Sequence, residues 1–319
     1  MTNPTETIEK DEPTEWGKII RGKPRPLHYV EYALVVVLFG FLRLLGPDRA
    51  SNLGGRVTRF IGPRLKKVSQ RAVDNLQIAF PDWSDEKIAE TVGDVWENLG
   101  RTAAEYAHLD CFQIRGDDPR LVGEGHATYY DIIDKGEQAI LVTGHFANWE
   151  VSGIVASQLG VMFDVIVRTT NNPLIDRLIM NKRNAVVSCG FIPKGLHGAS
   201  DIVRALKAGR SLAILGDQKQ DFGVPAPFFG RDAMTAHAPA RFALKYNLPV
   251  IPISTERLGP ARYKVVAHSP IDFTPSGDMN ADIHALTVKI NEALESFIRA
   301  RPGEWLWLHR RWAMKGAKR

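Results

Sequence analysis

The chain has 319 residues, with 41 basic and 36 acidic side chains, a net charge of +5 and a sequence pI near 9.1. This length suits one large α/β domain with an appendage, or two domains, and the positive charge favours an anionic partner such as nucleic acid, a phospholipid surface or an acidic carrier protein. The two cysteines, Cys111 and Cys189, lack the CxxC and Cys/His spacings of metal sites, and a disulfide framework is atypical of so long a chain. These totals predict a reducing compartment and no structural zinc.

The N-terminal part combines a polar tail with one strongly apolar segment. Residues 1–15 are charged and rich in Thr and Glu, which predicts a disordered tail, and the apolar segment starts too late for a secretory signal. That segment, residues 32–45, reads YALVVVLFGFLRLL, and its uninterrupted part is shorter than the roughly 20 residues of a membrane span. Basic residues flank it on both sides. We therefore expect a helix that lies in the cytoplasmic membrane interface or dips into one leaflet, with a buried core helix and a true span as alternatives.

The middle and end of the chain alternate between strands and helices. Ser84 is the expected N-cap of a long amphipathic helix that continues to Ala103, and a helix over 126–134 leads into the alternating region. We predict strands at 139–142, 163–167, 211–215 and 250–253, helices at 150–159, 174–187, 200–207 and 241–246, and a closing helix with an apolar face from Ile283 to Ile298. This order predicts an α/β fold, with a mostly parallel central sheet flanked by helices and an N-terminal membrane-associating helix.

The segment QAILVTGHFANWE holds the first candidate site. Its apolar run is typical of a buried strand, and Gly144 then allows a turn that delivers His145 and Glu150. An imidazole can accept a proton near neutral pH, and a carboxylate can orient it. The two residues are five positions apart, which is roughly 140° around a continuous helix, so they can meet only across a turn; Asn148 is a plausible N-cap there.

Other polar residues follow the remaining predicted strands. Arg168 follows the second strand, and Asp217 follows the third. The carboxyl ends of parallel strands share one edge of a sheet, so we expect these side chains to join His145 in one site. Taken singly, Arg168 could be a surface arginine and Asp217 a turn cap. Residues 218–244 are expected to contain a long loop that walls a groove, or a buried turn cluster.

These segments together resemble the bacterial lipid A biosynthesis late acyltransferases of the lauroyl/myristoyl type. The likeness runs in register from about Tyr29 to Trp312. It rests on Asn75-Leu76 with Phe80-Pro81, on the H-x4-D/E motif from His145 to Glu150, on Arg168 with Asn172-Pro173, on Gly216 to Gln218 with Pro227 to Gly230 and Thr235, and on WLWLHRRW from Trp305 to Trp312.

The resemblance implies an O-acyltransferase at the cytoplasmic face of the cell inner membrane. The expected donor is an acyl carrier protein thioester, the acceptor a hydroxyl of a lipid A precursor, and the third partner the membrane phospholipid surface. No cofactor and no metal are implied. The expected domains are a disordered polar tail at 1–28, a membrane-attaching helical segment at 29–64 and an α/β acyltransferase domain at 65–319.

The resemblance also implies roles for single residues. His145 would be the base and Glu150 would hold its imidazole, in a direct transfer without an acyl-enzyme, because no Ser or Cys has a GxSxG context. Backbone amides after His145 would stabilise the oxyanion. Arg168 would bind a phosphate or support the site, and Asp217 would orient a neighbour or the acceptor sugar. Asn148 and Asn172 are expected to support substrate binding. Three tryptophans are expected to lie near lipid headgroups or to pack inside the domain: Trp305, Trp307 and Trp312.

Three alternatives remain at this point. A glycerophospholipid or other glycolipid acyltransferase could use the same His/Glu chemistry. A non-catalytic basic membrane-binding module would not need the polar residues at the strand ends. Nucleic-acid binding has the least support, because the basic residues are dispersed and no recognised binding motif appears.

Overall fold

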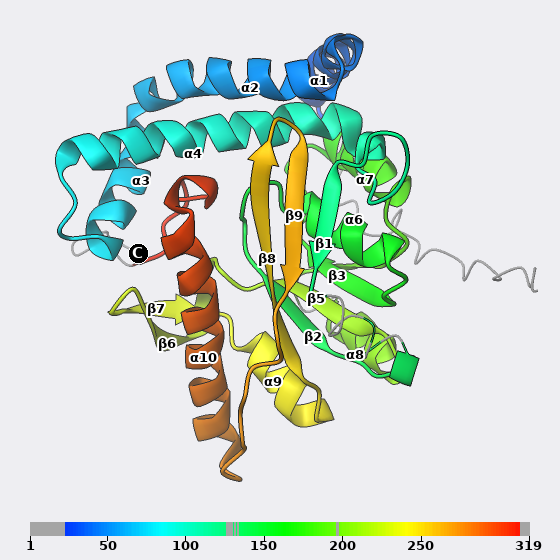
Figure 1. Ribbon diagram of the computed structural model, residues 1–319, viewed down its shortest axis with the longest axis vertical. Coiled ribbons are helices and arrows are strands. Elements are labelled where there is room, and N and C mark those ends of the chain that lie inside the picture. Colours follow the sequence, from blue (N-terminus) through cyan, green and yellow to red (C-terminus); the bar gives the residue numbers. More distant parts are fainter. Residues whose placement is uncertain (1–22, 126–129, 131, 133, 196–197, 313–319) are drawn as a thin grey trace, which may run out of the picture.

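The computed structural model describes residues 23–125, 130, 132, 134–195 and 198–312 (Figure 1). Its centre is a seven-stranded sheet in the order β1-β9-β8-β2-β5-β3-β4. Neighbouring strands are parallel except β8 and β9, which form an antiparallel hairpin. The strands are β1 (Leu121–Glu124), β2 (Ile140–Thr143), β3 (Phe163–Val167), β4 (Gly190–Pro193), β5 (Ser211–Leu215), β8 (Val250–Gly259) and β9 (Arg262–Ala267). The predicted α/β fold with a mostly parallel sheet is confirmed.

Helices cover both faces of this sheet, as the apolar strands require. One core cluster joins the sheet to α8, α9 and α10, and a second joins it to α6 and to η3 (Tyr106–Cys111). Figure 1 shows α10 and α6 on opposite sides of the sheet. The helices after β2 are α6 (Glu150–Gln158), α7 (Pro173–Asn184), α8 (Ala199–Lys207), α9 (Ala238–Tyr246) and α10 (Met279–Ala300).

Most predicted elements lie within a few residues of their observed positions. The strand predicted at 250–253 continues to Gly259, where it turns into β9, and the helix predicted at 174–187 ends at Asn184. Residues 126–129, 131 and 133 of the helix expected at 126–134 lie outside the described residues, as do residues 1–22 of the expected tail.

The segment expected to be a long loop is instead a β-hairpin. It consists of β6 (Lys219–Phe228) and β7 (Arg231–Thr235), and they pair in antiparallel fashion. Phe229 and Gly230 connect them with positive φ angles of 53° and 72°, which suits a tight two-residue turn between twisted strands. Phe228 and Phe229 are buried, so the apolar content that suggested a groove wall fills the core beside α10.

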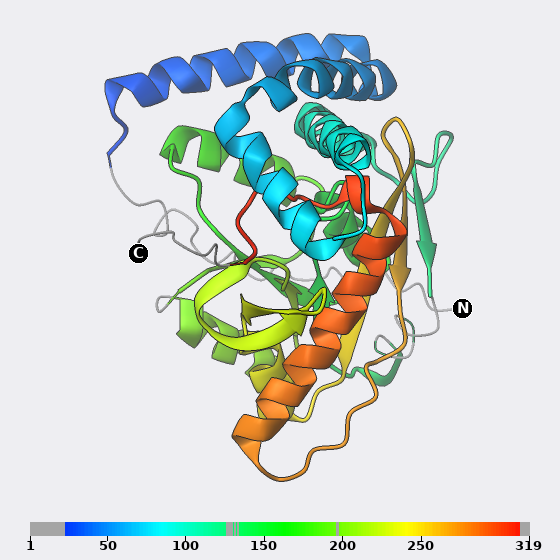
Figure 2. The same cartoon turned by 90° about the vertical axis from the view of Figure 1, so that its left-hand side faces the viewer.

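A layer of helices precedes the sheet. It contains α1 (Pro26–Leu45), α2 (Pro47–Ile61), η2 (Gly62–Arg64), α3 (Lys66–Ala79), α4 (Asp85–Glu105) and η3 (Tyr106–Cys111). The predicted cap of α4 is confirmed, because Oγ of Ser84 accepts the backbone N–H of Lys87. Figure 2 shows α1 lying across the top of the molecule, beside α2. Among the described residues α1 alone has the length and composition to cross a membrane, and its apolar side chains are mostly exposed. Its expected place in the interface stays a prediction.

The tryptophans of the C-terminal segment pack inside the domain. Trp305 and Trp307 are fully buried and Trp312 is 1 % exposed, so the alternative that placed them near lipid headgroups is wrong. Their rings pack against one another and against Phe228 and Phe229. Just before them, η5 (Pro302–Glu304) ends α10, and Trp305 forms an isolated β-bridge with Phe146. The C-terminal segment is therefore placed beside the end of β2.

Candidate active site

His145 and Asp217 form the centre of the candidate site. They follow β2 and β5, which are neighbouring parallel strands with Thr143 paired to Leu215. Nδ1 of His145 lies 2.9 Å from Oδ1 of Asp217, and the backbone N–H of His145 donates to Oδ2 at 2.7 Å. The indole N–H of Trp305 donates to the same Oδ2 at 2.7 Å. The carboxylate is fully buried and has three donors around it.

Gly144 makes this close approach possible. A Cβ atom at this position would lie 2.8 Å from the ring of Phe146 and 3.1 Å from Cγ of Asp217. Both separations are shorter than ordinary van der Waals contact. A residue with a side chain would therefore push the turn away from the carboxylate, which gives Gly144 a local reason to be glycine.

The carboxylate of Asp217 is held in its ionised form. Burial by itself would raise the pKa of Asp217, but the charge and hydrogen bonds of His145 outweigh it and hold that pKa well below its ordinary value. An ionised carboxylate accepts the Nδ1 proton of a neutral imidazole, so Nε2 is left as a proton acceptor. The side-chain amide nitrogen of Gln218 lies 3.3 Å from Nε2. His145 is thus arranged as a base whose free nitrogen faces away from its carboxylate partner.

Glu150 does not occupy the position that the sequence suggested. Its Oε1 lies 2.6 Å from Nη2 of Arg183, its Oε2 lies 2.8 Å from Nε of the same arginine, and the hydroxyl of Tyr106 donates to Oε1. The predicted pairing with His145 is therefore corrected: Asp217 is the partner of the imidazole. The physical reason is that α6 begins at Glu150 and a guanidinium on α7 offers this buried carboxylate two parallel hydrogen bonds.

The turn between His145 and Glu150 is held by α4. Ala147 has a positive φ of 44°, which is unfavourable for a residue with a side chain. Its carbonyl oxygen accepts from Nδ2 of Asn98 at 3.0 Å and from Oγ1 of Thr102 at 2.9 Å. These two donors on one helix face offset the strain and fix the direction in which the chain leaves His145.

Asn148 also belongs to this support rather than to the cavity lining. It is fully buried, and its Nδ2 donates to Oε2 of Glu105 at 2.9 Å. Its Oδ1 accepts the backbone N–H of Glu150 at 3.2 Å, although Trp149 is the N-cap residue of α6. Asn148 was expected to be the N-cap of this helix. It does bond to the first turn of α6, but it lies one position before the N-cap residue Trp149.

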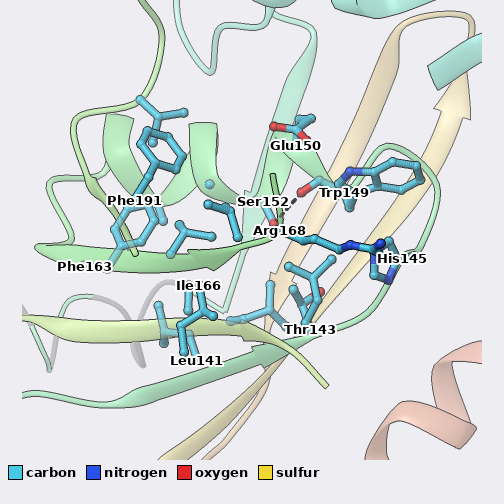
Figure 3. A pocket seen from close by; sticks show the side chains of 18 of the residues that line it. Leu141, Thr143, His145, Trp149, Glu150, Ser152, Phe163, Ile166, Arg168 and Phe191 are labelled. Atoms are coloured by element: carbon cyan, nitrogen blue, oxygen red, sulfur yellow. Dashed lines mark hydrogen bonds between the residues drawn. The ribbon is translucent and has the colours of Figure 1, made fainter. Parts of the chain in front are cut away.

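A cavity of about 350 Å³ begins at His145 and continues into the domain. Figure 3 shows Phe163 and Phe191 together on the side of the cavity away from His145. Between these ends the lining is mostly aliphatic, with Leu141 and Ile166 among its side chains. The cavity therefore has one polar end and one apolar end, which is a shape suited to an amphiphilic ligand.

Several cations line the polar part of this cavity. Arg168, which the sequence singled out, and Lys194, which it did not, are both in the lining. Burial and the charge of Arg168 lower the pKa of Lys194 below its ordinary value. Within the described part of the chain, the structure records no carboxylate hydrogen-bonded to either side chain. Two neighbouring cations without a paired carboxylate favour a negatively charged ligand.

Two expectations about the surroundings of His145 need correction. Asn172 is not in the cavity lining: it caps α7 and donates to Oε2 of Glu31 on α1 at 2.8 Å. Of the backbone amides proposed as oxyanion donors, two are occupied, because the amide of Phe146 bonds to Gly144 and that of Ala147 bonds to Glu304.

The sequence contained little signal for the partners of Glu150. Tyr106 and Arg183 lie 44 and 33 residues from Glu150 in the sequence. Each belongs to a segment with an ordinary helical pattern, which does not mark it as a partner of Glu150. Lys194 directly follows β4, a short strand that the apolar pattern did not predict, so the search of strand ends passed over it. Gln218 was part of the GDQ signature, next to Asp217.

Comparison with known proteins gives consistent matches over most of the chain. Residues 20–314 match the family model described as bacterial lipid A biosynthesis acyltransferase. The chain is 26% identical over 286 residues to a lipid A biosynthesis acyltransferase of Haemophilus influenzae, covering 84% of each chain. It is 22% identical over 281 residues to the lipid A biosynthesis myristoyltransferase of Escherichia coli, covering 86% of this chain and 84% of that protein.

Proposed function

Because the chain belongs to the bacterial lipid A biosynthesis acyltransferase family, we propose that it transfers a fatty acyl chain from an acyl carrier protein thioester to a hydroxyl of a lipid A precursor. Family membership makes it an acyltransferase of lipid A biosynthesis. The donor, the acceptor hydroxyl and the roles of residues below are the proposal. The observation that carries it is the pairing of His145 with Asp217 at the polar end of an apolar cavity.

In this mechanism His145 acts as the general base. Nε2 takes the proton of the acceptor hydroxyl while the oxygen attacks the thioester carbonyl carbon. The tetrahedral intermediate then collapses, the C–S bond breaks, and the carrier thiolate receives the proton from the imidazolium. The products are an ester and a free carrier thiol. Asp217 keeps the Nδ1 proton in place and stabilises the imidazolium while it exists.

The negative charge of the intermediate needs donors beside the imidazole. Gln218, whose amide nitrogen is near Nε2, and Arg168 on the same cavity lining are the residues we assign to it. Lys194 adds a second cation, which suits the phosphates of a lipid A precursor. Glu150, expected to be catalytic, is assigned a supporting role: with Arg183 it joins α6 to α7 along the cavity.

The acyl chain of the donor would occupy the apolar end of the cavity. Its carbonyl would lie near His145, and its methyl end would point towards Phe163 and Phe191 (Figure 3). Apolar lining favours a hydrocarbon chain by removing its surface from water. This arrangement explains why one cavity combines a base, the cations Arg168 and Lys194, and an aliphatic interior.

The surface of the molecule suits a reaction at the cytoplasmic face of the inner membrane. On α1, exposed apolar residues include Leu34, Val37 and Leu44, the last of them 86% exposed. The net charge of +5 favours both an anionic leaflet and an acidic carrier protein. We assign α1 to the membrane interface and the sheet domain to the cytoplasmic side.

The test is transfer by the purified full-length protein in detergent, with an acyl carrier thioester and a lipid A precursor. His145→Ala is expected to lower the rate by about 10² to 10⁴, the usual contribution of a general base. His284→Ala is the matched control, because His284 is exposed on α10. Full activity in His145→Ala would contradict the mechanism. Transfer to a glycerophospholipid precursor but not to the lipid A precursor would favour the competing acyltransferase class.

A further inference from the structure

A second groove lies between the N-terminal helix and the catalytic domain. It has a volume of about 490 Å³ and is bounded by α1, η3 and α7 with the residues that follow it. Its apolar walls are formed by Phe39 on α1, Leu109 on η3, and Leu178 and Val186 on the α7 side. The groove is separate from the cavity at His145, although α7 borders both. Lys182 and Val186 line the groove, whereas Arg183 and Val187 line the cavity.

The groove carries a positive charge. One of the cations that line it is Arg43, both of whose terminal nitrogens lie 2.5 Å from the carboxylate of Asp110, with which it forms an ion pair. Lys182 is the cation that remains, and its Nζ lies 5.4 Å from the centre of the Phe39 ring. Among the described residues the structure records no ion pair for it. Burial and then the charge of Arg43 lower the pKa of Lys182, and the carboxylate of Asp110 opposes this only in part.

The position of the groove suggests what fills it. Val36 is one of its lining residues and is 41% exposed, so the groove reaches the surface along α1. This is the helix that we assign to the membrane interface. A molecule that enters from there would come from the lipid leaflet. It would meet apolar walls along its chain and the ammonium group of Lys182 at its polar end.

We propose that this groove binds one anionic phospholipid of the surrounding membrane, with its phosphate at Lys182 and one acyl chain between Phe39 and Val186. The lipid fills the space between α1 and α7 and seats α1 on the domain. Direct protein contact between the two helices includes the N-cap residue of α7, Asn172, which donates to Glu31 and to the carbonyl oxygen of His28. This inference rests on the membrane attachment in the proposed function, but not on the acyl transfer.

The test is lipid retention by the full-length protein in a neutral detergent, measured by native mass spectrometry with phosphatidylglycerol or phosphatidylcholine. The wild type is expected to retain one phosphatidylglycerol and to prefer it over phosphatidylcholine. Lys182→Glu is expected to weaken retention by on the order of tenfold, because it replaces the cation with an anion. Val186→Trp is expected to do the same by filling the groove. Arg177→Glu is the matched control, because Arg177 is exposed on the same helix and the charge change is identical.

Three outcomes would overturn the proposal. The first is equal retention of both lipids, and the second is unchanged retention in Lys182→Glu and Val186→Trp. The third is displacement of the phosphatidylglycerol by a lipid A precursor, which would make the groove an acceptor site. Lys182→Met, which keeps most of the apolar stem, and a thermal unfolding curve for each variant separate a lost site from a misfolded protein. Because the comparison of the wild type with the Lys182 and Val186 variants is made without donor and without lipid A precursor, loss of acyl transfer and loss of lipid binding are measured independently.

Discussion

Nδ1 of His145 and Oδ1 of Asp217 are 2.9 Å apart, although the two residues are 72 positions apart in the sequence. The relationship follows from the sheet order, in which β2 and β5 are neighbours and end at the same edge. The partner of the imidazole is therefore supplied by the adjacent strand and not by the helix that follows the histidine. Asp217 and Glu150 are therefore expected to have different roles, the first in proton transfer and the second in stability.

Asp217→Asn is expected to lower kcat by about 10² to 10⁴ with little change in KM. The neutral amide neither stabilises the imidazolium nor fixes the productive tautomer. Steady-state kinetics with an acyl carrier thioester measure this. Asp232→Asn, at an exposed position of β7, is the control and should keep wild-type kinetics. An unchanged kcat in Asp217→Asn would remove this residue from the proton-transfer step.

Glu150→Gln is expected to affect stability more than catalysis. The change leaves the guanidinium of Arg183 without its charged partner in a site where the two side chains are only 9% and 18% exposed. Breaking such a buried pair costs about 3 to 5 kcal/mol of unfolding free energy. Urea unfolding measures the loss.

The double variant Glu150→Gln with Arg183→Met provides the control for this pair. Removing both charges together should cost less than the sum of the two single changes, because neither charge is then buried alone. If Glu150 instead oriented His145, Glu150→Gln would reduce kcat as strongly as Asp217→Asn does, in protein that is still folded.

Acid should destabilise the protein partly through His309. Burial lowers the pKa of His309 to about 4 from an ordinary value of 6.5. The unfolded chain therefore binds a proton at a higher pH than the folded chain, so this contribution to stability is complete above pH 6.5 and is lost as the pH falls towards 4. The effect should be visible in urea unfolding between pH 6.5 and 5.

His309→Phe isolates this contribution because it keeps an aromatic ring against Trp305. The variant should lose less stability than the wild type over the same pH interval. Two other histidines with lowered pKa values, His108 and His268, are the same in both proteins, so their effect cancels in the difference. Identical pH slopes would show that His309 is not the group that titrates.

Gly153 is expected to control the length of acyl chain that the cavity accepts. It lies in α6 on the cavity lining, and a Cβ there would be 3.9 Å from Phe163 and from Val187. Gly153→Ala therefore fits at ordinary contact distance and should also stabilise the helix by up to about 1 kcal/mol. Gly153→Leu projects farther into the cavity. We expect it to lower kcat/KM for long donors and to spare short ones.

A series of saturated acyl carrier thioesters measures this preference. Each methylene that no longer fits should cost about 0.8 kcal/mol of binding. The Ala variant is the intermediate member of the series and should resemble the wild type. If the Leu variant lowers kcat/KM equally for every chain length, the cavity near Phe163 is not where the acyl chain lies.

The sequence predicted features that depend on local pattern. The apolar runs identified most of the parallel strands, and the end of each run identified His145, Arg168 and Asp217. The pairing of carboxylate and imidazole was misassigned because Glu150 is near His145 in sequence, whereas Asp217 is brought to it by strand order. Strand order depends on which faces pack together, and a run of apolar residues does not encode it. For the same reason the sequence does not decide whether Trp305 lies near lipid headgroups or packs inside the domain.

The hydrogen bond from Trp305 to Asp217 makes the site depend on a residue far along the chain. A chain made on the ribosome emerges from its N-terminus, so His145 and Asp217 are made before Trp305. Until then Asp217 lacks one of its donors and the turn at Ala147 lacks the carbonyl of Glu304. The support of the carboxylate and of the turn beside it is therefore complete only when residues made late in synthesis are in place.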